Sequence, residues 1–125
     1  MAHSERFMKI VDETKGNVRE ISVEEALRQV KAAEDNVLLI DVREESEWVQ
    51  GHIPGSIHLS KGAIERDIES RVSDPDRPLI LYCGGGYRSI LAADSLQRMG
   101  YTNVKSMEGG WKAYEDAIKN EKIKN

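Results

Sequence analysis

Cysteine is nearly absent from this chain: Cys83 is the only one among 125 residues, which excludes an intramolecular disulfide. Long hydrophobic runs are also lacking. No window approaches the roughly 18 consecutive apolar residues of a membrane span, so we expect no membrane partner. The first residues, Met1 to Phe7, lack the apolar stretch of a secretion signal. These absences predict a cytoplasmic protein.

The charge balance narrows the class of partner further. Lys and Arg number 18 and Asp and Glu number 22, which gives a formal net charge of -4 at pH 7. A nucleic-acid binder normally carries a basic surface, so we expect no nucleic-acid partner. Hydrophobic residues make up 39% and charged residues 32% of the chain, a balance typical of a folded globular domain rather than a disordered segment.

The organisation of the chain predicts one domain, from residue 18 to residue 119, because no internal repeat or Pro-, Gly- or Ser-rich linker divides it. Residues 1–17 are polar with weak periodicity, and we expect a loosely ordered N-terminal segment there. Residues 120–125 are expected to form a charged, solvated tail.

Strand-like and helix-like segments alternate within this domain. Strands are expected at 18–21, 37–40, 79–82 and 104–107, and a short apolar piece follows a turn signal at 57–59. Two of these, 37–40 and 79–82, are continuous apolar runs, as expected of strands covered on both faces. Helices are expected after a capping box at Ser22 and Glu25, and at 63–72, 89–99 and 111–118. The alternation indicates an α/β fold with a mainly parallel sheet.

Cys83 follows one of the apolar runs, where a strand gives way to a helix. Ligand sites in parallel α/β sheets lie beyond the carboxyl ends of the strands. A lone cysteine is usually a small buried apolar residue. An ordinary turn, however, needs one or two glycines, whereas Cys83 precedes three, Gly84 to Gly86. We therefore interpret Cys83 as a nucleophile.

A nucleophilic cysteine reacts as the thiolate, which requires positive potential close to the sulfur. The loop can supply this potential in three ways. Consecutive glycine amides can curl into an anion-binding nest, the following helix directs its positive end toward the same point, and Arg88 offers a charged fork suited to a sulfonate or phosphate. The predicted binding residues are Gly84, Gly85, Gly86, Tyr87, Arg88 and Ser89.

Five short motifs occur in an order that resembles the rhodanese homology domain. They are Asp41-Val-Arg43, Glu47-Trp48, Gly51-His-Ile-Pro-Gly-Ser-Ile57, the loop from Tyr82 to Ser89, and Gly109-Gly-Trp111. The resemblance covers residues 18 to 119 and rests on the order of all five motifs. It implies a single rhodanese-like α/β domain with a five-stranded, mainly parallel sheet flanked by helices on both faces.

The resemblance also implies a two-step sulfur transfer. The Cys83 thiolate attacks the outer sulfur of a donor such as thiosulfate, sulfite leaves, and the persulfide passes its outer sulfur to a thiol or cyanide. The partners are then a small-molecule donor and acceptor, with a protein acceptor also compatible, and no metal or organic cofactor is required. As supporting residues, we expect Asp41 to brace the loop by hydrogen bonding and Arg43 to pair with Glu47.

Other matched positions look structural. The segment from Gly51 to Gly55 is interpreted as a turn, although His52 is a candidate catalytic base. His52 and His58 are candidate metal ligands, but no acidic or sulfur ligand completes the set. Trp48 and Trp111 are interpreted as core aromatics.

Two other functions remain open at this point. Cysteine-dependent phosphatases, including a branch with this fold, also place Cys and Arg around an anion-binding loop. Those enzymes have five residues between Cys and Arg, whereas four lie between Cys83 and Arg88, and they commonly have His where this chain has Tyr82. A non-catalytic rhodanese-like module that binds or regulates a partner is the other alternative. Since Gly84 and Gly85 stand where thiosulfate-preferring members often carry basic residues, we expect weak apparent affinity for thiosulfate.

Overall fold

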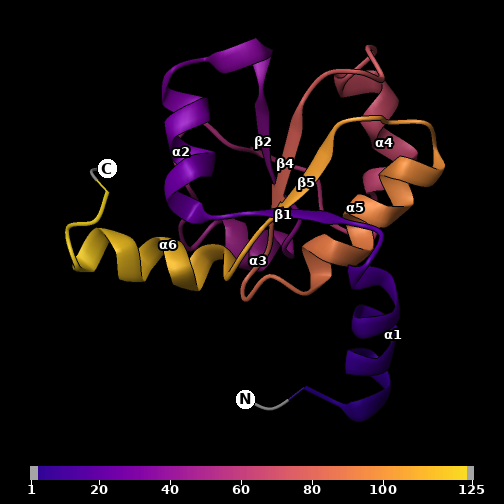
Figure 1. The fold of residues 1–125 in the computed structure, drawn as a ribbon, viewed down its shortest axis with the longest axis horizontal. Coiled ribbons are helices and arrows are strands. Elements are labelled where there is room, and N and C mark those ends of the chain that lie inside the picture. Colours follow the sequence, from indigo (N-terminus) through magenta and orange to yellow (C-terminus); the bar gives the residue numbers. More distant parts are fainter. Residues whose placement is uncertain (1–2, 124–125) are drawn as a thin grey trace.

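Five short strands form one sheet in which every pair of neighbours is parallel (Figure 1). The structure is a computed structural model and describes residues 3–123. The strands are β1 (Arg19–Ile21), β2 (Leu38–Asp41), β3 (Ile57–His58), β4 (Leu79–Tyr82) and β5 (Val104–Met107). Their order across the sheet is β1-β5-β4-β2-β3. The predicted sheet is confirmed, and it is parallel throughout.

Helices cover both faces of this sheet (Figure 1). One face carries α2 (Val23–Lys31) and α6 (Gly110–Lys119). The other carries α4 (Ile64–Arg71), α5 (Arg88–Arg98) and α1 (Glu5–Lys15). Two short elements, η1 (Glu34–Asn36) and α3 (Glu45–Trp48), complete the fold. Within residues 3–123, none of the helices combines the length and apolar character that crossing a bilayer requires.

The hydrophobic core is divided between the two faces. Leu79 and Leu81 of β4 pack in the cluster with α1, α4 and α5, whereas Ile80 and Tyr82 pack in the cluster with α2 and α6. Because successive side chains of a strand point to opposite faces, both halves of the apolar run are buried. This burial holds β4 at the centre of the sheet and fixes where the following loop begins.

The N-terminal segment differs from its prediction. Residues 1–17 were expected to be loosely ordered, but helix α1 occupies most of them, starting after Ser4, whose Oγ accepts a hydrogen bond from the Phe7 amide at 3.2 Å. Val11 is 1% exposed in the core, and Phe7 packs against the same cluster. Apolar residues four apart are enough to dock a helix whose other positions are polar. Residues 1 and 2 lie outside the described residues.

Two smaller predictions concern the start of α2 and the C-terminal tail. At the start of α2, Ser22 Oγ accepts a hydrogen bond from the Glu25 amide at 3.1 Å, but the Glu25 carboxylate binds Arg28 instead of completing the capping box. In the predicted tail, residues 120–122 are exposed, whereas Ile123 is half-buried against the core. Residues 124 and 125 lie outside the described residues.

Candidate active site

Cys83 directly follows β4 at the carboxyl edge of the sheet, and loop amides point at its sulfur. Its Sγ accepts hydrogen bonds from the Gly86 amide at 3.2 Å and the Ser89 amide at 3.4 Å. The Ser89 hydroxyl lies 3.5 Å from the same sulfur. N–H donors aimed at one sulfur atom polarise it. Cys83 is nevertheless only 1% exposed, so the sulfur is both polarised and shielded.

The three glycines of the loop differ in how strictly their positions require glycine. Gly86 has a φ of +97°, and a Cβ there would lie 2.9 Å from the Gly109 amide nitrogen. Both facts exclude a larger residue. A Cβ on Gly84 would come within 3.0 Å of Arg88 Nη2, whereas Gly85 is exposed and has more room. The tight conformation that turns amides toward sulfur therefore depends mainly on Gly86.

The amino end of α6 holds the start of this loop. The Trp111 amide donates to the Cys83 carbonyl oxygen at 2.7 Å, and the Lys112 amide donates to the Gly84 carbonyl oxygen at 3.1 Å. This approach is so close that a Cβ on Gly110 would overlap the Cys83 carbonyl oxygen. The Gly109-Gly-Trp111 motif thus places a helix end against the backbone of Cys83.

A buried pair of hydroxyls lies behind the sulfur. Ser89 Oγ and Ser106 Oγ are 2.7 Å apart, and both residues are 0% exposed. Ser106 belongs to β5, the neighbour of β4, and holds the Ser89 side chain beside Cys83. Ser106 is not among the predicted site residues. The available signal was a polar residue at a buried position of an inner strand, which normally requires a hydrogen-bond partner.

Arg88 has a partner that the sequence analysis did not assign. Its Nη1 and Nη2 donate to the two carboxylate oxygens of Glu47 at 2.8 and 3.0 Å. The hydrogen bond from Arg88 lowers the pKa of Glu47 and, reciprocally, raises the pKa of Arg88. The predicted pairing of Glu47 with Arg43 is therefore wrong. The guanidinium fork expected to face a substrate anion is directed at Glu47 in this structure.

Arg43 instead pairs with Asp41 inside the protein. Arg43 Nη2 donates to Asp41 Oδ2 at 2.8 Å and to the Gly51 carbonyl oxygen at 2.7 Å. Asp41 and Arg43 side chains are 0% and 4% exposed. Burial works against the charge of Arg43, but hydrogen bonding and attraction to Asp41 outweigh it, and the pKa of Arg43 is raised.

This buried pair is connected to the loop through Trp111. The Arg43 guanidinium lies 4.8 Å from the centre of the Trp111 ring, and the Trp111 amide holds the Cys83 carbonyl oxygen. The hydrogen bonds to the Asp41 carboxylate come from Arg43. Asp41 can brace the loop through Arg43 and Trp111, and it also lies beside Tyr82, the residue before Cys83, in the pairing of β2 with β4.

His52 of the predicted turn and His58 of β3 both contact backbone carbonyls and stack on Trp48. His52 Nδ1 lies 3.0 Å from the Trp48 carbonyl oxygen, and His58 Nε2 lies 2.7 Å from the Arg43 carbonyl oxygen. The Trp48 ring stacks on His52 at 3.4 Å and on His58 at 5.2 Å. Trp48 and Trp111 are half-buried rather than fully enclosed. Over residues 3–123, no group of three or more His, Cys, Asp or Glu side chains is arranged to hold a metal ion.

A cleft of about 430 Å³ opens above Cys83. The residues that line it are His3, Ser4, Phe7, Cys83, Gly85, Tyr87 and Arg88. This volume lies in the range of small-molecule sites. The site therefore combines a polarised sulfur with room for a small reactant.

Comparison with known proteins identifies a family whose model matches most of this chain. The model of the rhodanese-like domain matches residues 22–117. The protein YtwF of Bacillus subtilis (strain 168), provisionally named a sulfurtransferase, is 34% identical over 102 residues, which cover 82% of this chain and 95% of YtwF. Thiosulfate sulfurtransferase GlpE of Pseudoalteromonas translucida (strain TAC 125) is 36% identical over 83 residues, which cover 66% of this chain and 77% of GlpE.

A solved structure matches nearly the whole chain. RPA3614 of Rhodopseudomonas palustris CGA009 is described as a protein of unknown function and possible tyrosine phosphatase. It superposes with a TM-score of 0.80 and 30% sequence identity, covering 94% of each chain. The shared fold therefore includes relatives given two different names, and the loop chemistry has to discriminate between them.

Proposed function

Because this chain belongs to the family of rhodanese-like domains, we propose that it is a sulfurtransferase in which Cys83 carries the transferred sulfur as a persulfide. Relatives named sulfurtransferases support the transferase role. The observation that carries the proposal is the convergence of the Gly86 and Ser89 amides on Cys83 Sγ. Donors aimed at one atom suit a reaction in which that atom is anionic before and after the transfer.

In the first step, the Cys83 thiolate attacks the outer sulfur of a sulfane donor such as thiosulfate. A new S–S bond forms, the donor's S–S bond breaks, and its electron pair leaves with sulfite. In the second step, an acceptor thiolate or cyanide attacks the outer sulfur, and Cys83 leaves as thiolate. The partners are a small-molecule donor and acceptor, or a protein thiol as acceptor. Neither step calls for a metal or organic cofactor.

The pairing of Arg88 argues against the phosphatase alternative. A phosphate needs donors for several oxygens at once, and an arginine fork is suited to supply two of them. Here both terminal nitrogens of Arg88 are bound by Glu47. The loop also has only four residues between Cys83 and Arg88. The alternative of a binding module has no matching observation, since the cysteine is retained and polarised.

The proposal is tested by intact-mass analysis after exposure to thiosulfate, together with formation of thiocyanate from cyanide. Wild type is expected to gain the mass of one sulfur atom and to make thiocyanate. Cys83→Ser is expected to do neither while keeping its circular dichroism spectrum. Hydrolysis of aryl phosphates by an enzyme that gains no sulfur would instead establish the phosphatase. Absence of both reactions would favour the binding module.

Thiosulfate is expected to be a weak donor. It carries two negative charges, whereas the cation nearest the loop, Arg88, is neutralised by Glu47. Loop amides then provide most of the attraction, so we expect no saturation at micromolar thiosulfate. Steady-state kinetics over a wide thiosulfate range measures this, and saturation in the micromolar range would contradict it.

A further inference from the structure

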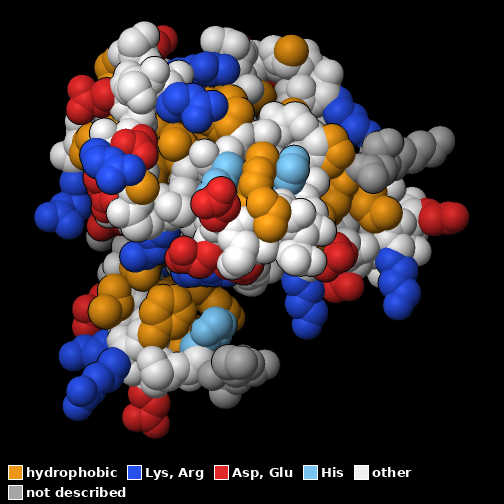
Figure 2. All heavy atoms as spheres, turned by 180° about the vertical axis from the view of Figure 1, so that it is seen from behind, with side chains coloured by type: hydrophobic (Ala, Val, Ile, Leu, Met, Phe, Trp, Pro, Cys, Tyr) orange, Lys and Arg blue, Asp and Glu red, His pale blue; other side chains and the backbone are white. Residues whose placement is uncertain are grey.

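One wall of the cleft above Cys83 lies outside the part of the chain that matches the family. The family model begins at residue 22, whereas Phe7 lies in the first turns of α1, Ser4 caps that helix and His3 directly precedes the cap. Hydrophobic side chains and a histidine gather on the lobe that α1 forms beside the main body (Figure 2). The contribution of α1 to the cleft therefore lies outside the residues that the family model matches, although RPA3614 covers 94% of this chain.

The wall is made of rings. The His3 ring meets the Tyr87 ring edge-on, with centroids 4.9 Å apart, and lies 5.3 Å from the Phe7 ring. Phe7 is anchored against the core, and Tyr87 comes from the loop that carries Cys83. Flat rings of this kind offer apolar contact area and stack well on other planar groups.

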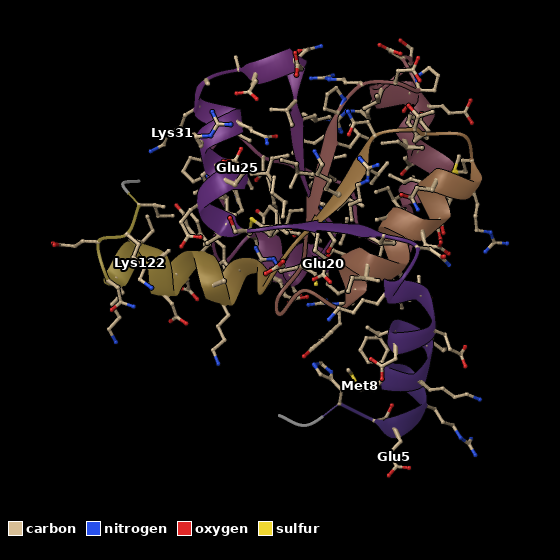
Figure 3. The ribbon with its side chains drawn as sticks, in the orientation of Figure 1. Glu5, Met8, Glu20, Glu25, Lys31 and Lys122 are labelled. Atoms are coloured by element: carbon tan, nitrogen blue, oxygen red, sulfur yellow. The ribbon has the colours of Figure 1, made fainter. Side chains whose placement is uncertain are left out.

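The charge of the cleft is low for a site that would take a dianion. Arg88 is the one Lys or Arg among its lining residues, and Glu47 holds its fork at 2.8 and 3.0 Å. A second cleft lies beside the same loop, and its charged lining residues are Lys15, Glu20 and Glu108. Glu20, in β1, is labelled in Figure 3. Cys83 does not line this second cleft. The reactive sulfur therefore opens toward the ring-lined side.

The cleft is also larger than an inorganic anion requires. About 430 Å³ is available, and thiosulfate would fill only a fraction of it. We propose that the ring wall of His3, Phe7 and Tyr87 binds the apolar group of an organic sulfane-sulfur donor, so that α1 selects such donors over thiosulfate. This inference rests on the proposed sulfurtransferase function.

The transfer from such a donor balances without any further reactant. For an organic thiosulfonate, R–SO2–S⁻, the Cys83 thiolate forms a bond to the terminal sulfur. The bond between that sulfur and the sulfonyl sulfur breaks, and its electron pair leaves with the sulfinate R–SO2⁻. The leaving sulfinate keeps R, which lies against the rings throughout. Thiosulfate differs only in having an anionic oxygen in place of R, and this oxygen gains nothing from an apolar wall.

The test compares two thiosulfonates that differ only in R. Benzenethiosulfonate and methanethiosulfonate are used as donors, and kcat/KM is measured for wild type, His3→Ala and Phe7→Leu. Wild type is expected to favour the benzene compound, and each variant is expected to reduce this preference about three- to tenfold, the worth of one ring contact. Intrinsic reactivity of the two donors cancels when the preference of a variant is divided by that of wild type.

A matched control lies on the same helix. Ile10 is 51% exposed and does not line the cleft, so Ile10→Ala is expected to leave the preference unchanged. Because Phe7 packs against the core, the thermal midpoint of Phe7→Leu is measured alongside; His3 is exposed, and its replacement does not depend on core packing.

A binding measurement separates this inference from the proposed function. Benzenesulfonate has no transferable sulfur, and its binding can be followed by NMR shifts of the His3 and Tyr87 rings in wild type and in Cys83→Ser. We expect the His3 and Tyr87 signals to move and the affinity to fall in Phe7→Leu. If no donor yields a persulfide while benzenesulfonate still binds at these rings, the transferase proposal is wrong and the cleft assignment stands. If sulfur is transferred but the donor preference is the same in wild type, His3→Ala and Phe7→Leu, the inference is overturned.

Discussion

Two arginine–carboxylate pairs lie at the carboxyl edge of the sheet, and their surroundings differ. The inner pair, Asp41 with Arg43, is 0% and 4% exposed, packed beneath Trp111. The outer pair, Glu47 with Arg88, is 36% and 30% exposed, beside the cleft. The inner pair connects through Trp111 to the backbone of Cys83, whereas the outer pair lies beside the cleft.

The loss of one charged partner is therefore expected to affect stability differently at the two pairs. Breaking a buried pair leaves an uncompensated charge in a dry interior, which is costly to stability. Breaking a partly exposed pair costs little stability because water replaces the lost partner. The contribution of the inner pair is therefore measured by the free energy of unfolding, and that of the outer pair by the kinetics of the reaction with the sulfur donor.

The largest effect is expected from the inner pair. Asp41→Asn removes the charge that compensates Arg43, and we expect a loss of about 3 kcal/mol in the free energy of unfolding, measured with urea. Adding Arg43→Met removes the stranded charge, so the double variant is expected to recover part of this loss. An Asp41→Asn variant with the stability and the transfer rate of wild type would contradict the expectation that breaking the buried pair costs more than breaking the exposed one.

An intermediate effect is expected from the hydroxyls behind the sulfur. Ser106→Ala leaves the buried Ser89 hydroxyl without its partner at 2.7 Å, at a cost of about 1 kcal/mol in unfolding free energy. Because Ser89 Oγ is then free to rotate away from Cys83, we also expect a several-fold slower persulfide formation, followed by stopped-flow or timed mass analysis. Ser95→Ala, on the same helix as Ser89, is the control and should not slow the reaction. Equal rates in all three proteins would show that the hydroxyl pair serves packing alone.

The smallest effect on stability is expected from the outer pair. Glu47→Gln should change the unfolding free energy by less than about 1 kcal/mol. It releases the Arg88 fork, so the KM for thiosulfate is expected to fall on the order of three- to tenfold. Initial-rate kinetics measures this. A KM that rises instead would mean that Glu47 holds Arg88 in the position that thiosulfate needs.

The pH dependence of stability supplies a control for the outer pair. The hydrogen bond from Arg88 lowers the pKa of Glu47 in the folded protein. Its contribution to stability is therefore complete above the usual carboxyl pKa and is lost as the pH falls through the lowered value. Unfolding midpoints measured from neutral to acid pH should fall less steeply for Glu47→Gln than for wild type. Parallel curves would indicate that the pair adds nothing to folding.

The strands and the position of Cys83 at the end of a strand could be predicted because they depend on local patterns. The predicted ranges 79–82 and 104–107 coincide with β4 and β5, and β4 is marked in the sequence by a continuous apolar run, as buried strands often are. The placement of Cys83 after β4 followed from the same run. Helix α1 was not predicted because only a few of its apolar residues pack against the core. The surface that they contact is formed by segments distant in the sequence.

The ion pairs could not be predicted because the competition among partners is decided in three dimensions. Arg43 and Glu47 have the spacing of a helical pair, but Arg43 faces Asp41 across a turn. Glu47 meets Arg88, which lies 41 residues away in the sequence. Ser106 pairs with Ser89 for the same reason, because β5 lies beside β4. Local spacing offers candidate partners, and topology chooses among them.

The near-complete enclosure of Cys83 has a consequence for cross-linking between molecules. Two copies cannot bring resting sulfurs into bonding contact while each thiol is 1% exposed at the floor of its cleft. A chain with one cysteine therefore stays free of covalent dimers in air as long as it is folded. In the proposed mechanism, the transferred sulfur would lie one bond beyond Cys83 Sγ, on the side of the cleft.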